Sequence, residues 1–258
     1  MKRFFFFLFL VSSSFCFATY IGNPASCYYF KNGIISDYQW INLRASFVYD
    51  RIYKCIYYQK NVPIFVTKPL KFEMRSALIS LNVSNYMDIY GIIGSAQEVV
   101  DDCYSNERFC WGGGARFCFF HIGNFAFGGD GRYFQSALTT KYALIEESLA
   151  PVDIVPPCGF LYQEVQGAFT ITYNMGIFLP YIGPYYLYSR NNPVPTDAVV
   201  RISGDDRLYD FGPKFLENKR KWGLLLGANL LSEQKFDLTL EGRFIAQNGI
   251  SIAAEVRF

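Results

Sequence analysis

Apolar and polar residues alternate along much of the chain, most regularly near its end. Within residues 236–244 and 250–258 the polar positions are Asp237, Thr239, Glu241, Arg243, Ser251, Glu255 and Arg257. Because successive side chains of a strand point to opposite faces, each run predicts a β-strand with one apolar and one polar face. The intervening Gln247-Asn248-Gly249 favours a tight hairpin turn. The last residue, Phe258, falls on the apolar face.

The same alternation predicts earlier strands at residues 40–53, 73–85, 87–96, 108–126, 124–136, 160–174 and 177–190, and three final strands within residues 221–258 bring the total to ten. Residues 54–71 fit either a long loop or short extra strands broken at Pro63. Prolines 180 and 184 leave the facing of residues 177–190 open. Connections are short at Asn85, Gly123, Met175 and Asn248, and long at Gln97, Ala137 and Asn191. This rhythm is typical of barrels, and even strand numbers favour ten to twelve.

Two arrangements suit this pattern. A soluble β-sandwich turns the apolar faces inward, whereas a transmembrane β-barrel turns them toward lipid and leaves the polar faces in its lumen. Residues 1–18 have the form of a signal peptide, with Lys2 and Arg3, an apolar stretch over residues 4–11, and the small residue Ala18. That stretch is shorter than the about 20 apolar residues of a spanning helix. Export favours an all-β, antiparallel transmembrane barrel over residues 19–258.

The location follows from both ends of the chain. An amphipathic last strand ending in Phe258 resembles the assembly signal of Gram-negative outer-membrane proteins, which implies the barrel assembly machinery and outer-membrane lipid as partners. Aromatic residues make up 19% of the chain, which suits girdles at two membrane interfaces. We therefore expect a cell outer-membrane protein.

Composition excludes several classes of function. The net charge is +2, without a basic run, so nucleic acid is not an expected partner. His121 is the single histidine, so neither a catalytic triad nor a zinc site is expected. Gly112-Gly113-Gly114 lacks the residues of a phosphate loop. The sequence predicts no cofactor and no enzyme.

Charges on the inward parity predict a charge-lined lumen that solvates ions and biases their passage. The candidate pore-lining residues are Arg44, Asp88, Arg116, Asp130, Arg132, Glu164, Asp237, Glu241, Arg243, Glu255 and Arg257. The alternative is that these charges pair across the lumen and plug it. About eight strands are nearly filled by side chains and about 16 to 18 leave a channel, so ten give a narrow interior.

Cysteines suggest a second function. Beyond Cys16 the disulfide candidates are Cys27, Cys55, Cys103, Cys110, Cys118 and Cys158. Disulfides persist in exported proteins, and spacing does not select a pairing. Bridges between molecules stay open as well, so the alternative to a porin is a disulfide-linked structural envelope protein with little or no conduction.

Several segments resemble the chlamydial major outer membrane protein family. They are Gly22-Asn23-Pro24-Ala25, INLRASFVYDR over residues 41–51, residues 109–135, FTITYNMGIFLPYIGPYYLYSR over residues 169–190, and residues 219–258 with GANLL, LTLEGRF and the final VRF. This chain looks like a shortened member, and Cys110 and Cys118 stand where the family has a close cysteine pair. The resemblance implies an outer-membrane porin for ions and small solutes, often trimeric, that also stiffens the envelope through disulfides.

Overall fold

The computed structural model describes residues 20–29, 42–59, 67–84, 86–100, 103–143, 152–153, 159–193, 199–201, 208–210, 215–232 and 235–258. The predicted signal peptide and Cys158 lie outside this part. Ten long strands are described: β1 (Asn42–Gln59), β2 (Thr67–Ser84), β3 (Met87–Val100), β5 (Arg108–Ile122), β6 (Phe125–Ala143), β8 (Gly159–Tyr173), β9 (Phe178–Pro193), β13 (Trp222–Ser232), β14 (Phe236–Phe244) and β15 (Gln247–Arg257).

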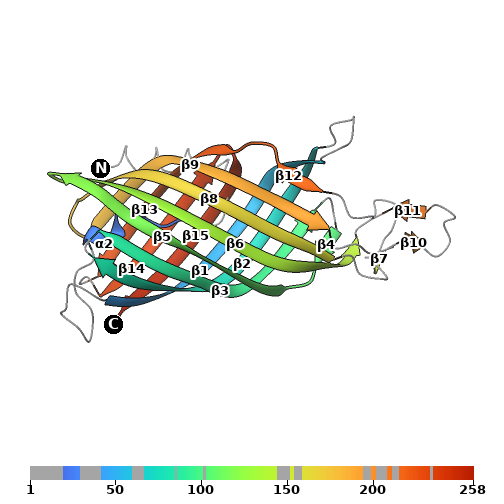
Figure 1. The fold of residues 1–258 in the computed structure, drawn as a ribbon, viewed down its shortest axis with the longest axis horizontal. Helices are drawn as coiled ribbons and strands as arrows, with labels where there is room; N and C mark the ends of the chain where they lie inside the picture. Colours follow the sequence, from blue (N-terminus) through green and yellow to red (C-terminus); the bar gives the residue numbers. More distant parts are fainter. Residues whose placement is uncertain are drawn as a thin grey trace, which may run out of the picture.

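These strands close into a barrel. Each pairs antiparallel with the next, and β15 pairs with β1 from Arg44 opposite Arg257 to Cys55 opposite Gln247. Figure 1 shows the strands tilted around one long axis. Because the sheet closes on itself, the ten strands satisfy one another's backbone groups without a free edge. The predicted fold class and the strand number of ten are confirmed.

Strand alternation gives the barrel an apolar outside and a polar inside. Outward residues such as Phe47, Ile79 and Leu240 are 58%, 48% and 54% exposed, whereas the inward Arg44, Ser80 and Glu241 are buried. This is the inverse of a soluble sandwich and matches a barrel that faces lipid. The short α2 (Ser26–Tyr29) is the one helix described, and no described helix is long and apolar enough to cross a membrane.

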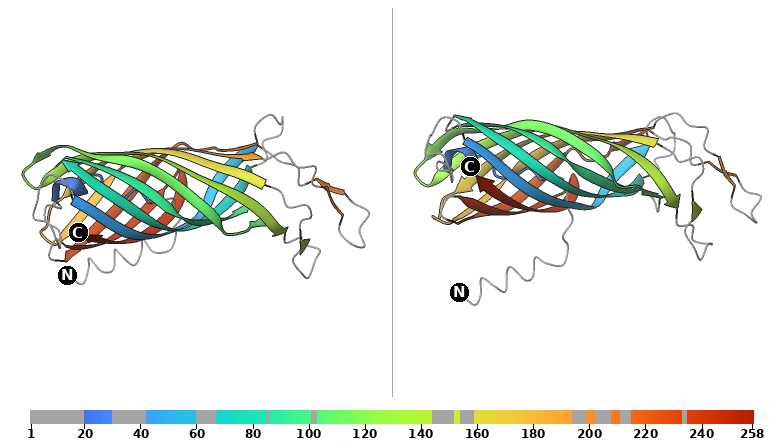
Figure 2. Two further views of the ribbon diagram at one scale, coloured as in Figure 1. Left: turned by 60° about the horizontal axis from the view of Figure 1, so that its bottom comes forward. Right: turned by 90° about the horizontal axis from the view of Figure 1, so that it is seen from below.

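The barrel has two different ends. The turn end carries the short connections after β2, β5 and β8, together with α2 and Phe258 (Figures 1 and 2). The loop end carries β7 (Val152–Asp153), β10 (Val199–Arg201) and β11 (Leu208–Asp210), and the last two form a separate hairpin beyond the barrel in Figure 1. The expected alternation of short and long connections is present up to β13.

The last hairpin breaks that alternation, and its turn was mispredicted. Asn248 and Gly249 lie within β15, where they pair with Lys54 and Ile52 of β1. The turn is at Ile245 and Ala246 instead: Ile245 has φ 78°, and the Ala246 N–H donates to the Phe244 carbonyl at 3.1 Å. Pairing with β1 therefore outweighs the local turn preference of Asn-Gly.

The wall narrows toward the loop end. β13, β14 and β15 have 11, 9 and 11 residues against 18 in β1 and β2, and above them the short β12 (Leu216–Asn218) bridges β1 and β9. Likewise β4 (Cys103–Ser105) bridges β3 and β6 above β5, so part of the predicted loop 97–107 is strand. The ring thus has ten strands near the turn end, and near the loop end eight: β1, β2, β3, β4, β6, β8, β9 and β12.

Candidate functional site

Residues 20–29, which we call the N-terminal segment, lie inside the barrel. Tyr20 is 6% exposed, and Ile21, Asn23, Ala25 and Cys27 are at most 1% exposed. The Tyr20 N–H donates to Asp50 Oδ2 at 2.6 Å. This placement could not be predicted from the sequence, because the segment has no alternating pattern.

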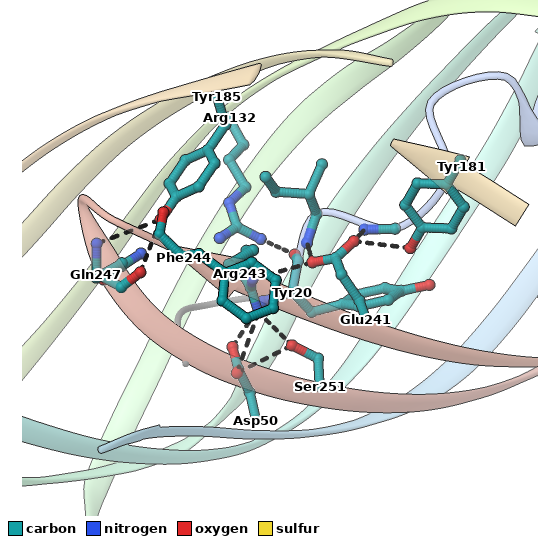
Figure 3. A network of polar contacts seen from close by, with 12 residues as sticks. Tyr20, Asp50, Arg132, Tyr181, Tyr185, Glu241, Arg243, Phe244, Gln247 and Ser251 are labelled. Atoms are coloured by element: carbon teal, nitrogen blue, oxygen red, sulfur yellow. Dashed lines mark hydrogen bonds and ion pairs between the residues drawn. The ribbon is translucent and has the colours of Figure 1, made fainter. Parts of the chain in front are cut away.

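One carboxylate holds the next two peptide groups of the N-terminal segment. The Ile21 N–H donates to Glu241 Oε1 at 2.9 Å and the Gly22 N–H donates to Oε2 at 2.8 Å. The Tyr181 hydroxyl donates to the same carboxylate at 2.8 Å, and Figure 3 shows these groups converging with Arg243. Glu241 therefore accepts from two elements besides its own strand.

Arginine side chains bind the backbone carbonyl groups of Tyr20 and Ile21. Arg132 donates to the Tyr20 carbonyl, and Arg116 Nη2 donates to the Ile21 carbonyl at 2.8 Å. Buried backbone groups need partners, and bonds to charged groups are the stronger kind. The N-terminal segment is thus fixed by charged side chains of β1, β5, β6 and β14.

Two glycines leave the space that the N-terminal segment needs inside the barrel. Gly22 has φ +76°, and a Cβ there would lie 2.8 Å from Arg116 Nη2. On the wall, a Cβ at Gly128 would lie 2.7 Å from the backbone nitrogen of Ala25. Both positions therefore require glycine so that the N-terminal segment can lie against β5 and β6.

All eleven predicted pore-lining residues face the interior and are at most 6% exposed. All but Asp237 form ion pairs with one another or with Asp50, which the prediction had omitted, while Asp237 accepts hydrogen bonds from Asn229 Nδ2 and Thr239 Oγ1. The pairs are Arg44 with Asp88, Arg44 with Glu255 (3.2 Å), Arg116 with Asp130 (3.3 Å), Arg132 with Glu164 (3.2 Å), Arg243 with Asp50 (3.3 Å), Arg243 with Glu241 (3.0 Å) and Arg257 with Glu255 (3.9 Å). That these residues line a conducting pore stays a prediction.

We call the charged part of the interior, with the N-terminal segment, the turn half, and the apolar part the loop half. In the loop half the rings of Phe72 and Tyr162 stack with centroids 4.9 Å apart, and Phe134 meets Phe72 at 6.0 Å. β2 and β8 are separated by several strands in the wall, so these rings meet across the lumen. The buried cluster consists of Ile52, Cys55, Tyr57, Leu70, Phe72, Met74, Ala96, Cys110, Phe134, Leu138, Tyr162 and Leu216.

Polar contacts also cross the loop half. Asn191 Nδ2 donates to Glu98 Oε1 at 2.6 Å, which joins β9 to β3. The hydroxyls of Tyr57 and Ser189 lie 2.5 Å apart and join β1 to β9. The wall has eight strands here, the number whose interior side chains just fill. The described residues therefore occupy the lumen at both levels.

β9 is where facing could not be predicted. Tyr181 and Tyr185 point inward, and the Tyr185 hydroxyl donates to the Gln247 carbonyl at 3.1 Å. An added Cβ at Gly227 or Gly223 of β13 would run into these two rings. Pro180 and Pro184 are four residues apart and therefore share one face of the strand, which was the indication available in the sequence. Both take outward positions, which leaves Tyr181 and Tyr185 facing inward.

Cys27, Cys55, Cys110 and Cys118 are free thiols, so the expected disulfides receive no support from them, and Cys158 lies outside the described residues. Cys27 and Cys118 are buried together in the turn half, and Cys55 and Cys110 in the loop half. Burial raises the pKa of the Cys27 thiol to about 12. Cys103 alone among the five described cysteines is half-buried. Buried thiols cannot reach a second molecule, so among the described cysteines these four are not available for bridges between molecules.

Other predicted features are placed as follows. The Phe258 side chain is 40% exposed on the outer face, and its N–H donates to the Leu43 carbonyl at 3.0 Å. His121 stacks on Tyr28 with ring centroids 4.3 Å apart. The described residues contain no group of acidic, cysteine or histidine side chains able to hold a metal ion.

No protein-family model and no curated protein matches the chain. Among solved structures, similarity extends to the outer membrane protease OmpT from Escherichia coli, with 10% identity over 84% of this chain and 93% of that one, at a TM-score of 0.40. An outer membrane channel from Pseudomonas putida F1 shows 8% identity over 88% and 99%, at 0.42. The translocator domain of the autotransporter NalP from Neisseria meningitidis shows 9% over 87% and 90%, at 0.40. At these scores nothing about activity follows.

Proposed function

We propose that the protein is an outer-membrane β-barrel that closes its own lumen and serves the envelope as a structural protein. The observation that carries this proposal is the double closure, by the N-terminal segment in the turn half and by the Phe72, Tyr162 and Phe134 rings in the loop half. A diffusion porin needs a wet path through its barrel. Here the inward charges are buried, and all but Asp237 form ion pairs with one another.

Membrane location is part of the proposal. Its support is the exposed apolar outer face, the signal-like residues 1–18 and the outward Phe258 at the end of the closing strand. The resemblance to the chlamydial major outer membrane protein family points the same way. Homo-oligomers, such as trimers, and bridges to other envelope proteins remain expectations.

A gated porin is the second candidate. It is favoured by a turn half that carries both signs of charge and holds the backbone of its filling segment through hydrogen bonds to charged side chains. Such contacts can be exchanged for water. The apolar loop half would also have to open before ions could pass.

Single-channel recording of the refolded protein in planar bilayers tests both candidates. We expect no discrete steps from the wild-type chain, from a chain lacking residues 19–29, or from Phe72→Ala/Tyr162→Ala, because each retains at least one closure. Only the combination should conduct. Frequent stable steps from the wild-type chain would establish an open porin and end the proposal, whereas rare voltage-driven openings, made more frequent by either change alone, would establish the gated porin.

A further inference from the structure

The outer face of the barrel changes from apolar to basic where β9 and β13 approach the loop end. The outward residues of β13 are Leu226, Leu224 and Trp222, which are 49%, 38% and 67% exposed. On β9 the outward Tyr186 packs edge-on against Trp222, with ring centroids 5.2 Å apart. Because tryptophan and tyrosine collect where a membrane meets water, this pair marks the boundary of the lipid-facing band on this side of the barrel.

Cations follow immediately beyond this boundary. Lys219, Arg220 and Lys221 connect β12 to β13 on its loop-end side (Figure 1). Lys219 and Arg220 are exposed, and Lys221 is half-buried. Arg190 of β9 is also exposed and lies in the part of that strand that pairs with β12. We call these four residues the basic patch.

Backbone hydrogen bonds anchor the connection that carries three of these charges. The Lys219 N–H donates to the Ile56 carbonyl of β1 at 2.8 Å. At the other end, the Leu187 N–H of β9 donates to the Lys221 carbonyl at 2.7 Å. The connection is thus tied to the wall on both sides, so its backbone needs little ordering when a ligand binds.

Among the described residues, no acidic side chain forms an ion pair with the basic patch. Glu217 lies beside the patch, and its two carboxylate oxygens accept from the hydroxyls of Tyr58 at 2.9 Å and Tyr188 at 3.3 Å. Lys221 Nζ lies 4.9 Å from the centroid of the same Tyr188 ring. The positive charge of the patch is therefore held against an aromatic surface.

A second exposed arginine on the outer face has a different environment. Arg75 of β2 pairs with Glu73 at 2.9 Å and with Glu107 at 3.8 Å, so acidic neighbours compensate its charge. The basic patch has four cations beside the apolar band without such compensation among the described residues. Cations in this position attract anionic lipid headgroups.

We propose that the basic patch binds the phosphate groups of a lipid headgroup in the leaflet at the loop end. Phosphate oxygens accept from ammonium and guanidinium groups, and the acyl chains of the same lipid lie against the apolar residues on the turn-end side of Trp222. Long loops belong to the external end of an outer-membrane barrel, so the ligand is a phosphorylated lipid of the outer leaflet. The proposal rests on the membrane location proposed above and is independent of whether the lumen conducts.

Binding of diphosphorylated lipid A to the protein refolded in a zwitterionic detergent tests the proposal. Native mass spectrometry should show that the wild-type chain retains this lipid, and that it does not retain phosphatidylcholine or the same glycolipid without its phosphates. Lys219→Gln/Arg220→Gln/Lys221→Gln should bind the diphosphorylated lipid at least about tenfold more weakly, since each cation near a lipid surface contributes about fivefold. The matched control Arg75→Gln should bind as the wild-type chain does.

Three results would overturn the proposal. Equal retention of the phosphorylated and dephosphorylated lipids, or equal binding by the triple variant and the wild-type chain, would mean that lipid is held by the apolar face alone. Displacement of the lipid by an equal concentration of inorganic phosphate would assign the basic patch to a free anion. The comparison of lipids uses the wild-type chain, so it decides even where the triple variant fails to refold. None of these results changes the outcome in planar bilayers, so the proposed closure of the lumen stands or falls separately.

Discussion

The two halves of the lumen are filled by opposite means. In the turn half, ten strands leave room for an extra stretch of chain, and charged side chains bind its backbone. In the loop half, eight strands leave room only for side chains, and aromatic rings meet across the axis. The difference teaches that the number of strands at each level decides whether a lumen takes in a segment or closes on its own wall.

The halves should also differ in how they fail. Buried ion pairs give little net stability when intact, yet the loss of one partner leaves a charge without compensation. An apolar cluster loses contacts in proportion to the volume removed. Substitutions in the turn half should therefore destabilise by leaving a charge without compensation, whereas substitutions in the loop half should destabilise by leaving an unfilled volume.

Arg116→Met should have the largest effect. This change removes the donor to the Ile21 carbonyl, the ion pair with Asp130 and the cation over the Tyr90 ring, whose centroid is 4.7 Å from the guanidinium carbon. We expect a loss of about 4 kcal/mol in the free energy of unfolding, measured by tryptophan fluorescence in urea with lipid vesicles. The matched control is Arg75→Met on the outer face, where an exposed pair with Glu73 is worth less than about 1 kcal/mol. Similar losses in both variants would contradict a charge-held turn half.

Phe72→Ala should cost about 3 kcal/mol in the same assay, because it leaves a cavity in the loop half. A cavity lined by apolar groups stays dry and can take up a small apolar molecule. Benzene should therefore restore part of the stability of Phe72→Ala and none of that of Arg116→Met. Rescue of both variants, or of neither, would mean that the two halves are not as different as their side chains indicate.

Two glycine substitutions on β6 distinguish a loss of stability caused by the N-terminal segment from one caused by the barrel wall. Gly128→Ala places a Cβ against the backbone of Ala25 and should cost about 2 kcal/mol, since backbone cannot move aside as a flexible side chain does. Gly131→Ala, three residues along the same strand, meets nothing within 4 Å and should be neutral. If removal of residues 19–29 abolishes the cost of Gly128→Ala, the effect belongs to the segment. A cost that remains would place it in the wall.

Much of the barrel could be predicted from the sequence, because side chains of a strand alternate between two faces. Assigning one face to lipid therefore assigns the other face to the lumen. Once the apolar face of the last two strands is assigned to lipid, Asp237, Glu241 and Arg257 must point inward, and they do. The same reasoning placed the other inward charges, although it left out Asp50, which shares the parity of Arg44.

The filling of the barrel could not be read in this way. Residues 20–29 have no periodicity, and their position depends on the width of a ten-stranded ring rather than on local preference. The narrowing to eight strands depends on β4 and β12, which have three residues each and lie within stretches that look like loops. Tertiary pairing also moved the last turn from Asn248 to Ile245.

That turn provides the smallest predicted effect. Ile245 is a β-branched residue with φ 78°, a conformation that costs about 1 kcal/mol or more for residues other than glycine. The turn lies on the turn-end side of β12, where the wall changes from ten strands to eight. β14 and β15 must end there, and the strained Ile245 allows the tight turn between them. Ile245→Gly should stabilise the barrel by about 0.5 kcal/mol after the entropy of glycine is subtracted. Ile177→Gly, in the turn before β9 and without a positive φ, lacks this relief and should not stabilise. Destabilisation by Ile245→Gly would instead mean that contacts of the exposed Ile245 side chain with lipid stabilise the barrel by more than the backbone strain destabilises it. The membrane would then set the position at which the wall changes from ten strands to eight.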